Sequence, residues 1–149
     1  MVAGPHVLPG YLDGIGDEET KVRVGARVWH RTGDAGYLDD RGRLWLLGRC
    51  SARIGVGVDG LYPFAVECAA LAIDGVERCA LVEHRGTRVL VVEPARGAPA
   101  DLPARILAKA AWARVAEVRL IAAMPLDRRH NAKIDYPALR ALLKGPNRG

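Results

Sequence analysis

The sequence predicts an α+β fold: a short β-rich N-terminal piece, followed by a compact domain with a small sheet and about three helices. Three observations support this prediction. From residue 51 onward the patterns follow the order strand, helix, strand, strand, helix, strand, helix. Before that point, short apolar runs are separated by glycine-containing turns. Half of the 149 residues are apolar, so the chain can bury a core.

The first 50 residues are predicted to form short strands and turns. Gly-Pro and Pro-Gly pairs mark turns in residues 1–20, where a short strand is expected around Val7. A run of valines ends at Trp29 and predicts one strand, and a turn at residues 39–42 precedes a second strand at residues 44–47. The large apolar side chains should form one face, made of Trp29, Tyr37, Trp45 and the leucines.

Three helices are predicted in the remainder of the chain. Residues 62–72 are apolar nearly all round, with Pro63 in the first turn, so this helix should be well buried. Asp101 can cap a second helix that runs to about residue 112, and Asp135 can cap a third. The inward face of the third helix is predicted to consist of Leu139, Leu142 and Leu143.

The strands of this part are recognised by alternating apolar residues. A possible hairpin strand covers residues 54–58. The runs 76–83 and 87–93 predict two strands joined by a His-Arg-Gly turn, and residues 115–122 predict a further strand. Residues 125–132 are expected to form an irregular basic loop.

Composition and charge exclude several classes of protein. The apolar runs are too short to span a bilayer, and the N-terminus lacks the basic and apolar segments of a leader. The net charge is +5, with 18 arginines against 4 lysines. This excess fits an ordinary solvated surface encoded by a GC-rich genome, or a face for an anionic ligand such as a nucleotide. Nucleic acid is not expected as a partner, because the arginines are scattered and aromatic residues are few.

The cysteines indicate a reducing environment. Cys50, Cys68 and Cys79 lack the spacing of a metal site, so no bound metal is predicted. An odd number without a Cys-x-x-Cys motif fits reduced thiols, and the cytoplasm is the expected location. No histidine close in sequence activates Cys50, which is expected to be inert.

Three motifs occur in a fixed order along the chain. They are Thr32-Gly33-Asp34, Gly48-Arg49 and Asn131-Ala132-Lys133-Ile134-Asp135. In this order and at about this spacing they resemble the adenylate-forming superfamily, which includes acyl-CoA synthetases, luciferases and the adenylation domains of peptide synthetases. The likeness covers nearly the whole chain, which corresponds to the last quarter or so of such an enzyme.

The resemblance implies roles in the activation of a carboxylic acid by ATP. Asp34, with Thr32 beside it, would bind the nucleotide, because a carboxylate accepts strong hydrogen bonds from both ribose hydroxyls. Arg49 would contact ribose or phosphate oxygens, or form a salt bridge at the domain joint. Lys133 would be the catalytic residue that stabilises developing charge, and Ser51 takes the hinge position. The alternative interpretations are a loop cap for Asp34 and a solvated loop lysine for Lys133.

The same resemblance implies a domain organisation. Residues 1–48 would belong to a truncated β-subdomain of the large adenylating domain, residues 49–51 to the hinge, and residues 52–149 to the C-terminal lid domain. ATP is the expected substrate, with Mg²⁺ held mainly by the missing upstream part. We therefore expect the chain to be inactive alone and to need the large adenylating domain in cis or in trans.

Further phrases resemble one branch of the superfamily, the β-lactone synthetases of long-chain olefin biosynthesis. They lie at residues 42–49, 61–63 and 129–133. This branch uses ATP to activate a long-chain β-hydroxy fatty acid, which then closes a ring through its own hydroxyl. The likeness implies a fatty or β-hydroxy fatty acid as the substrate.

Four positions depart from the general family pattern. The hinge position carries Ser51 where Asp or Lys is usual, and Ala132 replaces a glycine. The places of a lysine and a glycine that help to admit a pantetheine arm are approximately Gly55 and Val58, which argues against coenzyme A as a substrate. Three alternatives stay open: a fatty-acyl-CoA or acyl-carrier ligase, a stand-alone module that binds a nucleotide or a partner protein, and a small RNA-binding domain.

Overall fold

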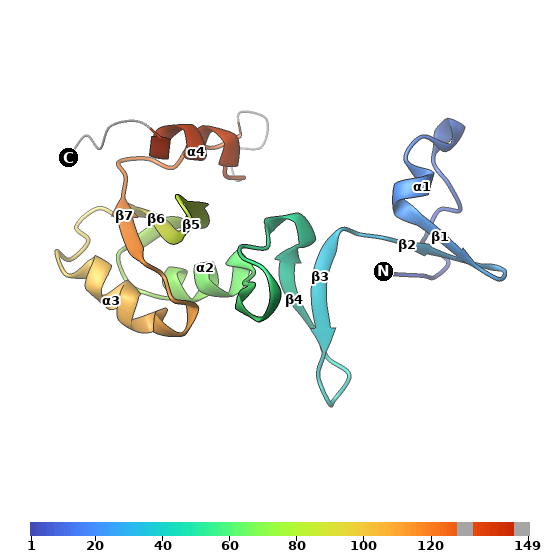
Figure 1. Ribbon diagram of the computed structural model, residues 1–149, viewed down its shortest axis with the longest axis horizontal. Helices are drawn as coiled ribbons and strands as arrows, with labels where there is room; N and C mark the ends of the chain where they lie inside the picture. Colours follow the sequence, from blue (N-terminus) through green and yellow to red (C-terminus); the bar gives the residue numbers. More distant parts are fainter. Residues whose placement is uncertain (128–132, 145–149) are drawn as a thin grey trace. The chain divides into compact units, whose positions relative to one another are not determined.

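The computed structural model describes residues 1–127 and 133–144. The chain forms two compact units, Met1–Ser51 and Ala52–Gly149. Figure 1 shows the elements of each unit along the chain. Their mixture of short helices and small sheets confirms the predicted α+β class.

The first unit begins with turns and a hairpin rather than the predicted strands. Val7 closes a turn, because its amide nitrogen donates a hydrogen bond to the Gly4 carbonyl oxygen at 3.0 Å. The valine run is divided in two, because Gly25 has a φ of +58° and reverses the chain. The elements of this part are a 3₁₀ turn at Leu12–Gly14, α1 at Asp17–Thr20, β1 at Lys21–Val24 and β2 at Arg27–His30.

A second hairpin consists of β3 (Asp34–Leu38) and β4 (Leu44–Arg49), which pair in antiparallel register. The turn predicted between them is confirmed, and Asp39 organises it. Its carboxylate accepts hydrogen bonds from Trp45 Nε1 and from the amide nitrogen of Arg43, both at 2.9 Å. These donors lower the pKa of Asp39 to about 2, with Trp45 as the largest cause.

The apolar face predicted for this unit does not become a buried core. A two-stranded hairpin supplies no second layer, so its large side chains remain accessible. Trp29 is half-buried. Leu47 is also half-buried, and the remaining large residues are between 48% and 67% exposed: Tyr37, Leu38, Leu44, Trp45 and Leu46.

The second unit is built on a three-stranded sheet with the order β5–β6–β7. β5 (Val76–His84) pairs antiparallel with β6 (Thr87–Pro94), which pairs in parallel with β7 (Glu117–Leu120). The predicted turn between β5 and β6 is confirmed, with φ of +51° at Arg85 and +76° at Gly86. β7 is shorter than the strand predicted from the sequence.

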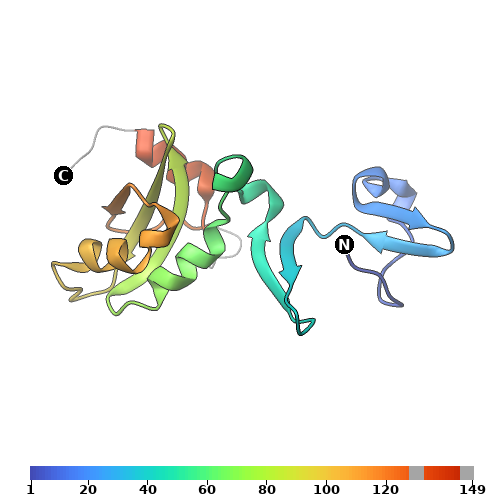
Figure 2. The ribbon, with the colours of Figure 1, turned by 60° about the horizontal axis from the view of Figure 1, so that its bottom comes forward.

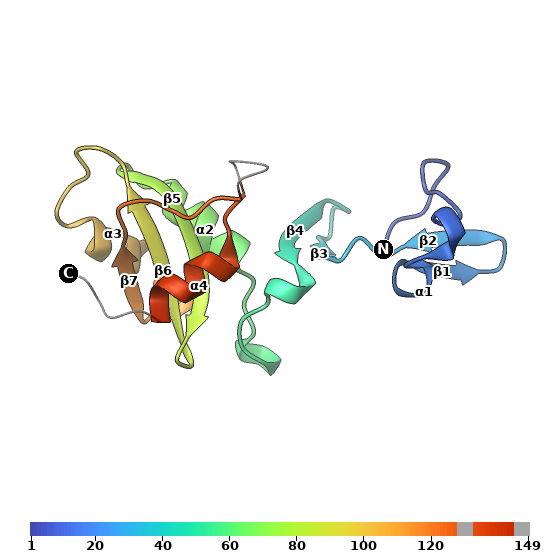
Figure 3. The same ribbon diagram turned by 90° about the horizontal axis from the view of Figure 1, so that it is seen from above.

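Helices cover both faces of this sheet, as Figures 2 and 3 show from two directions. α2 (Pro63–Leu71) and α3 (Leu102–Lys109) lie on one face, and α4 (Tyr136–Lys144) lies on the other. Because successive strand residues point to opposite faces, β5 and β6 are buried on both sides. The first face packs Val66, Leu81, Leu90 and Ile106, and the second packs Val82, Val91, Leu139 and Leu143.

The segment that follows residue 51 is not the predicted hairpin strand. Ile54 makes an isolated bridge with Leu61, and Gly57–Asp59 forms a 3₁₀ turn. Gly55 has a φ of +80° and therefore interrupts the extended backbone.

α3 is shorter than the predicted helix, and α2 is less buried than predicted. α3 ends at Lys109, and the side chain of Asp101 makes no capping hydrogen bond. α2 leaves Phe64 and Leu71 each 50% exposed. Its apolar composition therefore exceeds what one sheet face can bury, and uniform burial was a wrong prediction.

α4 confirms the predicted cap but only part of the predicted face. The amide nitrogen of Ala138 donates to Asp135 Oδ1 at 3.0 Å. Leu139 and Leu143 are 0% and 2% exposed, whereas Leu142 is 50% exposed. The i, i+4 spacing places the first two on one line of the helix, and that line faces the sheet.

We expect the second unit to lose stability at alkaline pH. Burial raises the pKa of the Cys79 thiol from 9.0 to about 12, and that of Tyr136 from 10.0 to about 12. The folded chain therefore keeps protons that the unfolded chain releases. This contribution to stability is complete below pH 9.0, the unfolded thiol value, and is lost as the pH rises towards 12. Urea denaturation across this range measures the loss.

The control for this prediction is Tyr136→Phe, which removes one of the two titrating groups. The free energy of unfolding of this variant should fall less steeply between pH 9.0 and 12 than that of the unaltered chain. Identical slopes in the two proteins would contradict the assignment to Tyr136.

Candidate functional site

Thr32, Asp34 and Arg49 lie together at one end of the β3–β4 hairpin. Asp34 and Arg49 are partners in the strand register, and Arg49 Nη1 lies 3.4 Å from Asp34 Oδ1. The same Nη1 donates a hydrogen bond to the Thr32 carbonyl oxygen at 2.7 Å. The amide nitrogen of Asp34 donates to Thr32 Oγ1 at 3.2 Å. The structure thus brings the three predicted nucleotide-binding residues into one cluster.

Backbone conformation explains why this cluster forms. Gly33, between Thr32 and Asp34, has a φ of +76°, and a Cβ there would lie 3.3 Å from Arg49 Nη1. The Gly33 carbonyl oxygen accepts a hydrogen bond from the amide nitrogen of Cys50 at 2.8 Å. The turn before β3 is therefore tied to the end of β4, and the side chains of Asp34 and Arg49 come from the two paired strands.

The cluster is open to solvent. The side chain of Asp34 is 40% exposed and that of Arg49 is 67% exposed. An exposed ion pair contributes only about 0–1 kcal/mol to stability, so it is not what holds the hairpin together. The Asp34 carboxylate can therefore accept hydrogen bonds from the hydroxyls of a ligand, and the guanidinium keeps donors for ligand oxygens.

Lys133, the predicted catalytic residue, belongs to the second unit and is exposed. Its carbonyl oxygen accepts a hydrogen bond from the amide nitrogen of Asp127 at 2.8 Å. The next residue, Ile134, pairs with Leu126 in an antiparallel bridge. We use the name Lys133 neck for these paired segments, residues 125–127 and 133–135.

Comparison with known proteins decides what this chain is related to. No protein-family model matches it. Olefin β-lactone synthetase of Stenotrophomonas maltophilia is 38% identical over 150 residues, which cover 89% of this chain and 27% of that enzyme. 2-Succinylbenzoate–CoA ligase of Listeria innocua is 37% identical over 82 residues, which cover 55% of this chain and 17% of the ligase.

Solved structures agree with these relatives. Apo MatB from Rhodopseudomonas palustris matches with a TM-score of 0.70 and 26% identity, over 95% of this chain and 29% of that one. ATP-bound MatB matches with a TM-score of 0.68 and 25% identity, over the same shares of both chains. The chain belongs to the adenylate-forming superfamily. It corresponds to the C-terminal region and spans about a quarter of the length of these proteins, 27% for the synthetase.

The remaining motif residues lie at the chain boundary between the two units or outside the described residues. Ser51, the predicted hinge residue, lies in the 3₁₀ turn Cys50–Ala52 and is the last residue of the first unit. Its role as a hinge stays a prediction. Asn131 and Ala132 lie outside the described residues, as do the basic residues 128–130.

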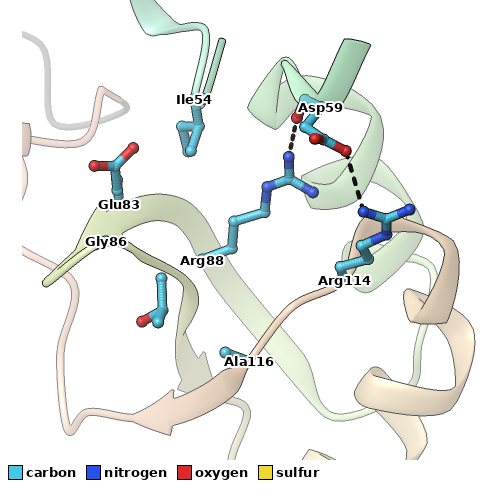
Figure 4. Close-up of a pocket in the computed structure, with 9 residues that line it drawn as sticks. Ile54, Asp59, Glu83, Gly86, Arg88, Arg114 and Ala116 are labelled. Carbon is cyan, nitrogen blue, oxygen red and sulfur yellow. Dashed lines mark hydrogen bonds and ion pairs between the residues drawn. The ribbon is translucent and has the colours of Figure 1, made fainter. Parts of the chain in front are cut away.

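A pocket of about 310 Å³ lies in the second unit and is lined in part by Gly55. Figure 4 shows Asp59, Arg88 and Arg114 at this pocket. Arg88 extends along this pocket. Its Nη1 donates a hydrogen bond to the Ala113 carbonyl oxygen at 2.7 Å, and its Nη2 donates one to the Asp59 carbonyl oxygen. Arg114 Nη1 lies 3.1 Å from Asp59 Oδ1. Both arginines thus hold the turn at Asp59 against the body of the unit.

In the part of the chain that the structure describes, no group of three or more His, Cys, Asp or Glu side chains is placed to hold a metal ion. Within residues 1–127 and 133–144, every helix is too short or too polar to cross a membrane.

Sequence reasoning missed two carboxylates that contact the segments flanking the Lys133 neck. Glu67 on α2 accepts a hydrogen bond from the hydroxyl of Tyr136 at 3.4 Å. Glu93 at the end of β6 accepts one from the amide nitrogen of Met124 at 2.7 Å. Each is a lone acidic residue in a largely apolar run, and this pattern is the signal by which both could be found.

Proposed function

We propose that this chain is the C-terminal part of an ATP-dependent, AMP-forming enzyme that activates a carboxylic acid as an acyl-adenylate. The observation that supports this most is the solvent-open cluster of Thr32, Asp34 and Arg49 in a member of this superfamily. Because the chain spans 27% of the related synthetase, the proposal includes the large adenylating domain, in cis or in trans, as a partner. The proposed location is the cytoplasm.

The proposed reaction transfers AMP to the acid. A carboxylate oxygen of the acid attacks the α-phosphorus of ATP, and the bond to the bridging oxygen breaks as pyrophosphate leaves. Asp34 accepts hydrogen bonds from the ribose hydroxyls, and Arg49 donates to ribose or phosphate oxygens. Lys133 stabilises the charge that develops on the reacting oxygens, an effect of about 3–4 kcal/mol for one well-placed donor. Mg²⁺ would be held mainly by the large domain.

The finer proposal is a β-lactone synthetase that acts on a long-chain β-hydroxy fatty acid. The match to olefin β-lactone synthetase supports it, since it extends over 89% of this chain at 38% identity. In this reaction the β-hydroxyl oxygen attacks the activated carbonyl carbon, AMP leaves and the hydroxyl proton is released. No coenzyme A takes part.

A second candidate is an acyl-CoA ligase with the same first step. The match to 2-succinylbenzoate–CoA ligase favours it, because the identity of 37% is nearly as high, although it covers 55% of this chain. In that case the acyl-adenylate is attacked by the thiol of coenzyme A, and AMP again leaves.

A chimera tests the proposal. This chain replaces the matching segment of the S. maltophilia synthetase, and the product is assayed for exchange of labelled pyrophosphate into ATP. We expect exchange that depends on a long-chain β-hydroxy acid, whereas the isolated chain should give none. A folded chimera without exchange, beside an active parent enzyme, would contradict the proposal. Product analysis then separates the two candidates, because a lactone forms without coenzyme A and a thioester forms only with it.

Replacing Asp34 by alanine should mainly weaken ATP binding. The change removes a charged acceptor of hydrogen bonds, so the KM for ATP in the chimera should rise about tenfold. The turnover number should change less, because the ribose is bound in the ground state as well as in the transition state. Asp40→Ala, which removes an exposed carboxylate at the tip of the same hairpin, is the matched control. Equal KM values for the two variants would argue against the nucleotide role.

A further inference from the structure

We propose that Glu93 and Glu67 are positioning residues that fix the Lys133 neck from its two ends. The inference rests on the proposed function, because the neck matters for the reaction only if Lys133 is the catalytic residue. Glu93 contacts the residue just before the neck, and Glu67 contacts the residue just after it.

Glu93 ties the start of the neck to the sheet. Its Oε2 accepts a hydrogen bond from the amide nitrogen of Met124 at 2.7 Å, and its Oε1 accepts one from Arg78 Nη1 at 3.0 Å. The side chain of Glu93 is 16% exposed and Met124 is 5% exposed, so the contact between these two residues is largely shielded from water. Arg78 Nη1 and Glu93 Oε1 also form an ion pair, and a hydrogen bond between charged groups is stronger than one between neutral groups.

Glu67 ties the end of the neck to a different element. Its Oε1 accepts hydrogen bonds from the amide nitrogen of Leu81 at 2.9 Å and from the Tyr136 hydroxyl at 3.4 Å. Tyr136 is the first residue of α4, directly after the neck. Burial raises the pKa of Glu67 and, with the nearby Glu67 charge, raises the pKa of Tyr136 to about 12. The pair is therefore an internal polar link that joins α2, β5 and α4.

Between these two links the neck is held by pairing and packing. The Asp135 amide nitrogen donates to the Pro125 carbonyl oxygen at 2.9 Å, in addition to the bond between Asp127 and Lys133. Leu126 and Ile134 pack against the core face that contains α4. The backbone at Lys133 is therefore held by the Glu93 link, by the Glu67 link and by the pairing within the neck. A displacement of about 1 Å in a catalytic group can reduce a rate about a hundredfold, so this positioning matters for the chemistry.

The first test measures amide hydrogen exchange on the 149-residue chain. Glu93→Ala leaves the shielded Met124 amide without its acceptor, so the Asp127 and Asp135 amides should exchange about tenfold faster. Glu93→Gln keeps an oxygen acceptor and should restore most of the protection. Unchanged exchange at both neck amides in Glu93→Ala would overturn the proposal.

Glu77 provides a matched control. Its Oε1 lies 3.8 Å from the same Arg78 Nη1, but its side chain is 51% exposed. Glu77→Ala removes a carboxylate beside Arg78 and should leave the neck amides unchanged. If Glu93→Ala does not fold, Tyr136→Phe tests the link at the other end of the neck, because it removes only the hydroxyl that donates to Glu67. Faster exchange of the Asp135 amide in that variant supports the proposal, and unchanged exchange overturns it.

The second test measures turnover in the chimera. Glu93→Ala should lower kcat for adenylate formation about tenfold while the KM for ATP stays within about twofold. Glu93→Gln should recover most of kcat, which a general loss of stability does not explain. Lys133→Ala distinguishes a failure of the proposed function from a failure of the positioning role. If it has no effect, the proposed function fails; if it has a large effect beside normal turnover of Glu93→Ala, only the positioning role fails.

Discussion

Replacing Lys133 by alanine is expected to lower the rate of adenylate formation by about a hundredfold to a thousandfold in the chimera. The loss corresponds to one donor that acts on charge developing in the transition state. The KM for ATP should change little, because this interaction is stronger in the transition state than in the bound ground state. Stability should also hold, since Lys133 is exposed and alanine keeps the carbonyl oxygen that accepts from Asp127. Acid-dependent pyrophosphate exchange and the thermal midpoint measure these quantities.

Lys109→Ala is the control for this result. Lys109 is the last residue of α3 and is exposed, so its removal changes net charge by the same amount at a site remote in sequence from the motif. Its rate should match that of the unaltered chimera. If Lys133→Ala matched it too, the catalytic role of Lys133 would be wrong.

Replacing Leu139 by alanine is expected to destabilise the second unit by about 2–5 kcal/mol. Leu139 is 0% exposed and packs between α4 and the sheet, where a truncated side chain leaves a cavity. A loss of this size is a large part of the roughly 5–15 kcal/mol that stabilises an ordinary domain. Urea denaturation followed by circular dichroism measures the change in the free energy of unfolding.

Leu142→Ala makes the same chemical change on the same helix. Leu142 is 50% exposed, so the expected loss is within about 1 kcal/mol. The comparison tests which face of α4 is buried, because the sequence alone predicted that both leucines point inward. Similar losses in the two variants would contradict the face that the structure assigns.

The fold was predictable where a local pattern is strong. Pro63 at the start of α2 and the turn at Arg85-Gly86 are consequences of backbone preferences that act within a few residues. The prediction failed where one residue changes the local conformation. Gly25 converts a single valine-rich strand into a hairpin, and Gly55 interrupts the strand expected near Ile54.

The candidate site was predictable in part. Thr32, Asp34 and Arg49 were chosen from their motifs, and the hairpin register places them together. Their chemical roles, and that of Lys133, stay predictions. Glu67 and Glu93 were not found from the sequence, because their partners lie 69 and 31 residues away along the chain.

Patterns in the amino-acid sequence are enough to predict the order of the main strands and helices of the second unit, the superfamily and the residue types of the candidate site. These depend on local periodicity, turn chemistry and motifs, all of which act over short stretches of chain. Three features became visible only in the folded chain: Asp34 faces Arg49, Leu139 rather than Leu142 is buried, and two carboxylates flank the Lys133 neck. These features depend on distances between residues that are remote in the chain, and the pairing of strands and the packing of helices on the sheet set those distances.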